Sequence, residues 1–297
     1  MPTSTTDSRA DARPDARTDS RRAEFIEFAG TEPDERTGAG TRTWFARGQN
    51  FVVAYSTAVT GDVLTRTGQP DEYVVILPDE ACAATVRTAD GEQTVSGQAV
   101  IVMPPGESSI VAGADCDLVR LFTVRSEDVA GASVNRDSYA TANPKVPAFT
   151  PWPDPPAGHR IRVYPLAEVP EDPKRFGRIF RCSTFMVNFL NPRIGPRDPD
   201  ALSPHAHDDF EQCSLAVNGD FVHHIRTPWT TRKRDWLDDD HRTCGSPSVT
   251  VIPPQAVHTT EAIGSGRNQL IDIFCPPRAD FSARPGAVLN ADDYPTP

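Results

Sequence analysis

The sequence lacks three features that would each indicate a particular class of protein. Its six cysteines are scattered, and no two of them form a C-x-x-C pair. This pattern argues against a disulfide framework and suits reduced thiols in the cytoplasm. No apolar run approaches the roughly 18 residues of a membrane helix, and the N-terminus has no apolar core of a secretory signal. We therefore expect a cytoplasmic protein.

Positive charge is also in short supply. The formal net charge is −11 at pH 7, whereas proteins that bind nucleic acid or anionic membranes usually present basic patches. No helix-turn-helix signature precedes the β-rich part of the chain, which argues against a transcription factor. We expect a small-molecule substrate, with no nucleic acid or membrane as partner.

Short segments rich in β-branched and aromatic residues make up most of the chain. They are separated by clusters of Gly, Pro, Asn and Asp, a rhythm typical of antiparallel barrels or sandwiches and not of alternating strands and helices. With 297 residues, of which 38% are hydrophobic, the chain can bury a real core. The segments include NFVVAYSTAV, EYVVILP, QAVIVMP, DLVRLFTV, EQCSLAV, FVHHIR, SVTVIPP and QLIDIF.

Composition divides the chain into four parts. Residues 1–22 interleave Asp and Arg with almost no apolar side chains, so we expect a disordered tail that cannot offset its ordering entropy. Prolines are dense between 142 and 160, which predicts an extended linker. The predicted β domains are therefore residues 23–141 and 161–297.

The segment SPHAHDDFEQ carries the strongest chemical signal. His205 and His207 are two residues apart, so on a strand both imidazoles project from one face, and Glu211 can return to that face after a short turn. His258 follows Pro253 downstream. Three imidazoles and a carboxylate suit Fe, Mn, Co, Ni or Zn and leave coordination positions open. The alternative is a set of solvated loop histidines beside an acidic run.

These residues resemble the two signature motifs of the cupin superfamily, whose members are small antiparallel β-barrels of the jelly-roll type with a metal in the mouth. The first motif reads G-x5-H-x-H-x3,4-E-x6-G. Here His205, His207 and Glu211 match it, Gly219 follows one residue late, and the leading glycine has no clear match. The second motif reads G-x5-P-x-G-x2-H-x3-N. Here Pro253 and His258 match it, while Gln255 and Ala262 replace its glycine and asparagine.

A faint internal repeat suggests a bicupin, that is, two cupin barrels in tandem. If Gly91 is set against Gly219, the ligand positions fall on Leu77, Asp79 and Ala83. The segment with Pro104 and Gly106 matches the second motif separately, and there Ser109 replaces the histidine. The sequence therefore predicts a first barrel without metal ligands, which serves as structural support or as the interface of a homodimer. The alternative is a single cupin barrel beside an unrelated β domain. The extra polar residues 227–247 are interpreted as an insertion near the rim, partly helical.

Further candidates lie around the predicted metal. His223 and His224 follow one another on a strand, so one of them faces the barrel interior, either as an acid or base or as a packed histidine. Arg226 can clamp a substrate carboxylate or form a surface ion pair. Candidates for orienting the imidazoles or for hydrogen bonds to a polar ligand are Asp208, Asp209, Gln212, Thr259, Thr260, Gln269 and Asp272.

The resemblance implies one divalent first-row metal, with Fe preferred and Mn, Ni, Co or Zn as alternatives. The commonest activity of such a three-His, one-Glu cupin site is that of a dioxygenase, in which an oxygen-rich substrate chelates the metal. A ligand-free first barrel also resembles bicupin isomerases of keto-sugar acids, so an isomerase or lyase acting on a keto acid is the second hypothesis, with His223 or His224 as acid or base. A non-catalytic binding protein is the third.

Overall fold

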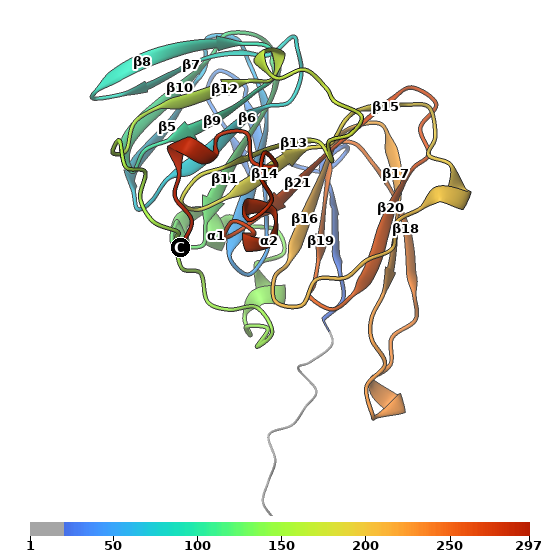
Figure 1. Ribbon diagram of the computed structural model, residues 1–297. Helices are drawn as coiled ribbons and strands as arrows, with labels where there is room; N and C mark the ends of the chain where they lie inside the picture. Colours follow the sequence, from blue (N-terminus) through green and yellow to red (C-terminus); the bar gives the residue numbers. More distant parts are fainter. Residues whose placement is uncertain (1–20) are drawn as a thin grey trace, which may run out of the picture.

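The structure, a computed structural model that describes residues 21–297, consists of two antiparallel β-barrels that lie side by side (Figure 1). This arrangement confirms the predicted all-β class. The predicted disordered tail lies outside the described residues except for its last two positions. Each barrel is formed by a larger and a smaller sheet, and the two larger sheets face one another.

The first barrel is built mainly from the N-terminal half of the chain. Its larger sheet has the strand order β12 (Arg162–Pro165), β9 (Ala99–Met103), β6 (Tyr73–Leu77), β11 (Cys116–Thr123), β4 (Phe51–Ala58), β3 (Arg42–Arg47) and β2 (Glu35–Arg36). Its smaller sheet has the order β5 (Val63–Gln69), β10 (Gly106–Ala112), β7 (Ala83–Thr88) and β8 (Gly91–Ser96).

The second barrel repeats this plan. Its larger sheet has the order β1 (Glu24–Glu27), β19 (Ser248–Ile252), β16 (Gln212–Asn218), β21 (Arg267–Phe274), β14 (Met186–Phe189) and β13 (Arg178–Arg181), and β15 (Arg193–Ile194) also pairs with β21. Its smaller sheet has the order β18 (Asp240–Gly245), β17 (Asp220–Arg226) and β20 (Val257–Ala262).

The barrels exchange edge strands. The N-terminal strand β1 pairs with β19 of the second barrel, where Phe25 lies opposite Thr250, and β12 pairs with β9 of the first barrel, where Val163 lies opposite Ile101. The predicted domains followed chain order, so their boundaries differ from the sheets in the structure. Each barrel is thus completed by a segment from the other half of the chain, which ties the two together.

Alternation along the strands creates two kinds of core. Along β6, Val74 and Ile76 enter the apolar core between the larger sheets, whereas Tyr73, Val75 and Leu77 fill the interior of the first barrel. Both faces of this strand are buried, which explains why its sequence is a continuous apolar run and does not alternate with polar residues.

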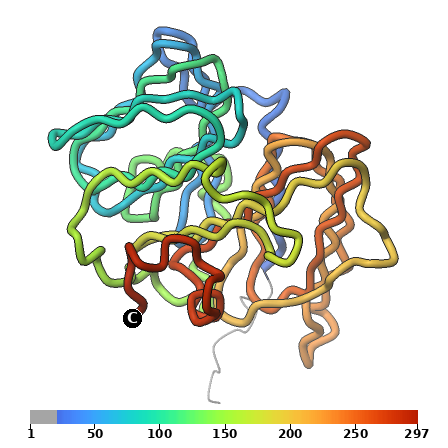
Figure 2. The backbone as a smooth tube through the Cα atoms, turned by 45° about the horizontal axis from the view of Figure 1, so that its top comes forward, coloured from blue at the N-terminus to red at the C-terminus, as the bar shows by residue number. Residues whose placement is uncertain are grey.

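The connecting segments run over the outside of the barrels. The proline-rich stretch 142–160 contains no helix or strand, and the backbone N–H of Trp152 donates to the carbonyl of Ser183 (2.7 Å). The C-terminal segment lies against the first barrel (Figure 2), where the Tyr294 hydroxyl donates to Glu72 (3.0 Å).

The helices are short: α1 (Glu127–Ala132), η2 (Arg136–Tyr139), η3 (Leu166–Glu168), η4 (Pro199–Ala201), η5 (Lys233–Asp235), α2 (Ala279–Ser282) and η6 (Ala291–Asp293). Within residues 21–297, none of the helices has the length and apolar character needed to cross a membrane.

The segment interpreted as an insertion is a long hairpin connection. Residues 227–239 join β17 to β18 and carry the short helix η5, while 240–245 form β18 itself. This loop projects from the end of the second barrel (Figure 1). The corresponding hairpin of the first barrel, β7 to β8, has only Ala89 and Asp90 between its strands.

Candidate metal centre

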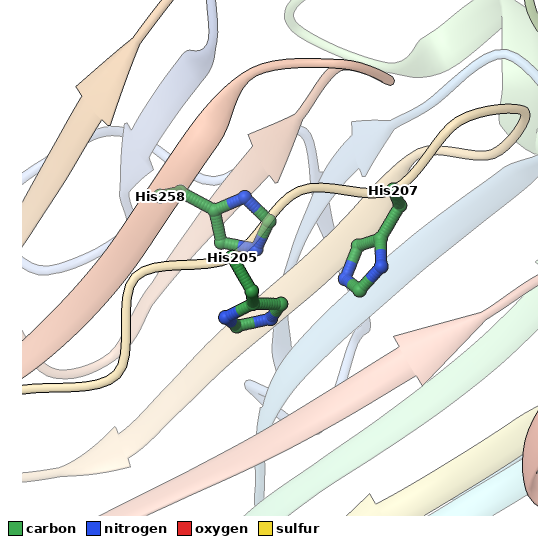
Figure 3. Close-up of side chains that lie close together, drawn as sticks. All are labelled: His205, His207 and His258. Atoms are coloured by element: carbon green, nitrogen blue, oxygen red, sulfur yellow. The ribbon is translucent and has the colours of Figure 1, made fainter.

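Three histidines converge at the mouth of the second barrel. His205 lies on the loop before β16 and pairs with His258 of β20, because the backbone N–H of each donates to the carbonyl of the other (3.0 and 2.8 Å). His207 lies farther along the same loop (Figure 3). One ring nitrogen from each of the three histidines lies within 4.8 Å of the others. The structure thus brings together three of the four predicted ligands.

Backbone carbonyls orient two of these rings. Nδ1 of His205 lies 2.9 Å from the carbonyl oxygen of Ser203, and Nδ1 of His258 lies 2.9 Å from that of Ala256. A carbonyl can only accept, so Nδ1 of each ring carries the proton and Nε2 keeps its lone pair. A carbonyl partner of this kind is the usual way in which a protein fixes the tautomer of a metal-binding histidine.

Burial keeps the inner rings neutral. It lowers the pKa of His207 to about 4 and that of His258 to about 4, because charging an imidazole away from water is unfavourable. His205 is exposed. Neutral imidazole is the form that binds a metal ion, so half-buried His207 and buried His258 are in the binding form at neutral pH.

Glu211, the predicted carboxylate ligand, does not join the three rings. Its Oε2 accepts a hydrogen bond from the backbone N–H of Gln49 (2.6 Å) in the first barrel. The side chain is buried there, and burial raises the pKa of Glu211 to about 7. Glu211 comes directly before β16, so its side chain lies on the opposite side from that of the first residue of the strand.

Gln212 takes the position expected for Glu211. Its Oε1 lies 2.9 Å from Nε2 of His207 and 3.3 Å from Nε2 of His258. The sequence contained a signal for this register, since Gly219 follows Gln212 after six residues, as the first cupin motif requires, and is one residue late only when counted from Glu211. From the sequence, Gln212 was expected only to orient the imidazoles or to flank the ligands.

A buried acid stands behind Gln212. Oδ1 of Asp272, on β21, accepts hydrogen bonds from Nε2 of Gln212 (3.2 Å) and from the hydroxyl of Ser214 (2.9 Å). These bonds fix the amide of Gln212 with its oxygen toward the histidines. Burial raises the pKa of Asp272 to about 6. The inward alternation of β16 and β21 brings these three side chains together.

The turn before His258 has a positive φ at the position where the second cupin motif has its glycine. Gln255 has φ 66° and is the sole residue other than glycine with positive φ in the range 21–297. Its backbone N–H donates to the carbonyl of His207 (2.5 Å). The departure from the motif at this position therefore changes the residue but not the turn.

The candidate catalytic residues of β17 separate by face. His223 is buried inside the barrel, where Nδ1 lies 3.0 Å from the hydroxyl of Thr260, and burial lowers its pKa to about 3. His224 points outward, with Nε2 3.0 Å from a carboxylate oxygen of Glu261. Arg226 is exposed and forms an ion pair with Asp239. The structure therefore places His224 and Arg226 away from the three rings.

A cavity of about 140 Å³ adjoins the centre. His205, His258, Gln212 and Asp272 line it, and Arg193 stands at its edge. Arg193 is exposed, and its guanidinium has no hydrogen-bond or ion-pair partner in the described part of the chain. A second, larger cavity of about 1060 Å³ adjoins His207.

The first barrel has the same frame with other side chains. Tyr73 on β6 lies opposite Met103, the residue before a Pro-Pro pair, just as Gln212 on β16 lies opposite Ile252. Matching these registers corrects the predicted counterparts. Leu77, Asp79 and Ala83 rested on the alignment of two glycines, and Ser109 on the match of Pro104 and Gly106 to the second motif. The counterparts of His205, Gln212, His258 and Asp272 are Arg66, Tyr73, Ser108 and Arg120.

No family model and no curated protein matches the chain. Solved structures do. A variant of oxalate decarboxylase from Bacillus subtilis aligns with a TM-score of 0.58 at 13% identity over 89% of this chain and 80% of that one. Oxalate decarboxylase from Lactobacillus farciminis, solved as a formate complex, aligns with a TM-score of 0.54 at 14% identity over 88% and 89%. AerE from Microcystis aeruginosa aligns with a TM-score of 0.52 at 10% identity over 85% and 99%.

At such low sequence identity the alignments establish a similar fold and nothing about function. They agree with the two-barrel architecture and with the motif that first suggested it. Among the described residues, the second barrel contains the one cluster of three or more potential metal ligands. The chain thus shares its two-barrel fold with these structures, and its candidate metal centre lies in the second barrel.

Proposed function

We propose that the protein is a metal-dependent enzyme that carries out lyase or isomerase chemistry on a small keto acid or related carboxylate. The observation that carries this proposal is the convergence of His205, His207 and His258 beside a small cavity that His205 and His258 line. Proteins place three imidazoles together chiefly to bind a metal ion.

The donor set fits one divalent first-row metal. His205, His207 and His258 would hold it, with the amide oxygen of Gln212 as a fourth donor. Imidazole and amide ligands are uncharged, so the ion would keep its full charge and favour an anionic oxygen ligand. When bound, such an ion supplies Lewis-acid polarisation of a carbonyl or carboxylate oxygen.

The cavity selects a small anion. Its volume of about 140 Å³ is well below the roughly 300–1,000 Å³ of pockets for drug-sized ligands. Arg193 offers its guanidinium at the edge of the cavity, and guanidinium groups bind carboxylates through two parallel hydrogen bonds. A substrate of a few heavy atoms with a carboxylate would be oriented between Arg193 and the histidines.

Asp272 is the group placed to hold or accept a proton. Ser214 and Gln212 both donate to its Oδ1, so the carboxyl is held in one orientation while it lines the cavity. His223 does not line the cavity, and its ring contacts the hydroxyl of Thr260. It is therefore not in a position to exchange a proton with a molecule in the cavity. We assign Asp272 as acid or base and His223 as a residue that positions β20.

The names of the similar structures support this class of substrate. Two are oxalate decarboxylases, one of them holding formate, and oxalate is a small dicarboxylate. A dioxygenase is the second candidate, because a site with three protein imidazoles leaves positions for both a chelating substrate and O₂.

The experiment begins with elemental analysis of the purified protein. The protein is then incubated with oxalate, with small α-keto acids and with β-diketones, while product formation is followed by NMR and dissolved oxygen by an electrode. We expect turnover of a keto acid or dicarboxylate without stoichiometric oxygen uptake. Stoichiometric oxygen uptake would select the dioxygenase instead, and a protein without bound metal would contradict both.

A matched pair of variants ties the activity to the site. His207→Ala removes an inward ring, whereas His224→Ala removes a histidine from the outer face of the same barrel. We expect activity to be lost in the first variant and retained in the second. Equal activity of the two would refute the assignment of the centre.

A further inference from the structure

The interior of the first barrel contains a buried cation that forms no ion pair with any residue the structure describes. Arg120, on β11, is 6% exposed, and its Nε has no hydrogen-bond partner. Within the described part of the chain, its guanidinium forms no hydrogen bond or ion pair. It lies near the ring of Phe122, whose centroid is 5.7 Å away. Burial lowers the pKa of Arg120, but arginine starts from so high a value that the side chain stays charged.

An unpaired buried charge is strongly unfavourable, and proteins normally pair such groups or use them to bind a ligand. Arg120 lines a cavity of about 470 Å³ at the mouth of the barrel. Arg66 and Arg125 line the same cavity. Hydroxyl groups that can donate to an oxyanion come from Thr65 and Thr67.

The acidic residues around this cavity that the structure describes form no ion pair with Arg120, and the charges of Glu35 and Asp128 act on it only through space. Asp128 is engaged by Arg66, whose Nη1 and Nη2 both donate to it. Glu35 and Glu127 line the cavity but are exposed. The buried guanidinium is therefore left for a group that enters from outside.

The position of this cavity in the fold adds a second argument. Arg66 lies opposite Ser108 in the first barrel as His205 lies opposite His258 in the second, and Arg120 occupies the place of Asp272. The mouth that holds a candidate cation site in one barrel is thus lined with cationic side chains in the other.

We propose that the mouth of the first barrel binds a small oxyanion, either the carboxylate of an organic acid or inorganic phosphate, with Arg120 as its buried anchor. Arg125 contacts the anion from the rim, and Arg66, held by Asp128 and Gln69, completes the cationic wall. This site is separate from the metal centre and does not depend on the proposed reaction.

Isothermal titration calorimetry on the full chain in a low-chloride buffer tests the proposal. Inorganic phosphate and acetate are titrated separately, which distinguishes the two sources of an oxyanion. We expect saturable binding of at least one of them, weakened at least tenfold in Arg120→Met. Binding should be unchanged in Arg226→Met, which removes an exposed arginine of the second barrel, and in His207→Ala.

Three results would overturn the proposal: no binding of either anion, unchanged binding in Arg120→Met, or loss of binding in His207→Ala. Should Arg120→Met fail to fold, Arg125→Gln at the exposed rim serves instead, and it should weaken binding with a reduced dependence on salt. In the absence of added anion, Arg120→Met should melt at a higher temperature than the parent, because it removes an unpaired buried charge. A lower melting temperature would contradict the absence of a partner.

Discussion

The two barrels place different chemistry on equivalent strands. In the second barrel, the residues that face the mouth from β16, β20 and β21 are Gln212, His258 and Asp272. In the first barrel, the same positions hold Tyr73, Ser108 and Arg120, and the hydroxyls of Tyr73 and Ser108 bond to one another (2.9 Å). The two barrels share the strand frame, whereas the inward residues decide whether a cation or an anion is favoured.

The inward side chains that follow these positions along β6 and β16 also differ between the two barrels. Val75 and Leu77 follow Tyr73 on the inward face of β6, and they pack against other apolar side chains. On β16 the next inward residues are Ser214 and Ala216, which leave room for the Asp272 network. The polar side chains behind Gln212 therefore favour the second barrel as the place of the proposed metal site.

The largest expected effect comes from removing a ring of the centre. His258→Ala should lower metal affinity and activity by more than about 100-fold, since even indirect partners of metal ligands are worth about 10–100-fold. Metal content by elemental analysis and turnover are the measurements. Ser108→Ala, at the matching position of the first barrel, should change neither. A protein that keeps full metal content without His258 would disprove the centre.

Neighbouring residues test the register of β16. Gln212→Ala should lower metal affinity by about 10–100-fold, because it removes the amide oxygen beside His207 and His258. Glu211→Gln should leave metal affinity unchanged, because that side chain contacts the first barrel. Titration of the apoprotein with Mn²⁺ or Zn²⁺ measures both. The reverse order of effects would restore Glu211 as the ligand.

The register of β16 is a feature that the sequence did not predict. The H-x-H spacing and His258 were sufficient to predict the fold and three converging rings. The side on which Glu211 lies depends on the residue at which β16 begins, and a shift of one residue reverses the face of every side chain. The bulge between Gly106 and Ser108 likewise moves the inward position from Ser109 to Ser108.

Two other features of the structure could not be predicted from the residues near them in the sequence. The pairing of β1 with β19 joins segments from opposite ends of the chain, and periodicity within a segment says nothing about its partner. Arg120 lies in DLVRLFTV, a run that predicts a strand with one polar residue near its middle. Only the structure reveals that this residue is buried without a counterion.

Metal removal should destabilise the protein through the second barrel. A ligand present at 100 times its dissociation constant stabilises the folded state by about 2.7 kcal/mol, so stripping the metal with a chelator should lower the free energy of unfolding by about that amount. Differential scanning calorimetry with and without EDTA measures the change. His258→Ala should show no such difference, and a chelator effect that persists in this variant would place the metal elsewhere.

The smallest effect concerns the turn that both barrels use after their Pro-Pro pairs. Gly106 in the first barrel has φ 97°, and Gln255 at the equivalent position of the second has φ 66°. A Cβ costs roughly 1–2 kcal/mol in this region, partly offset by the greater freedom that glycine has in the unfolded chain. Gln255→Gly should therefore stabilise the protein by about 0.5–1 kcal/mol.

The reciprocal variant, Gly106→Gln, should destabilise by a similar amount. A Cβ at Gly106 would meet no atom within 4 Å, so the cost comes from the backbone alone and the two barrels can be compared directly. Urea unfolding measures both variants. If Gln255→Gly instead weakens metal binding, the glutamine has been retained for the centre, because its N–H bonds to the carbonyl of His207 and a more flexible residue would loosen that loop. The same turn would then serve packing in one barrel and ligand placement in the other.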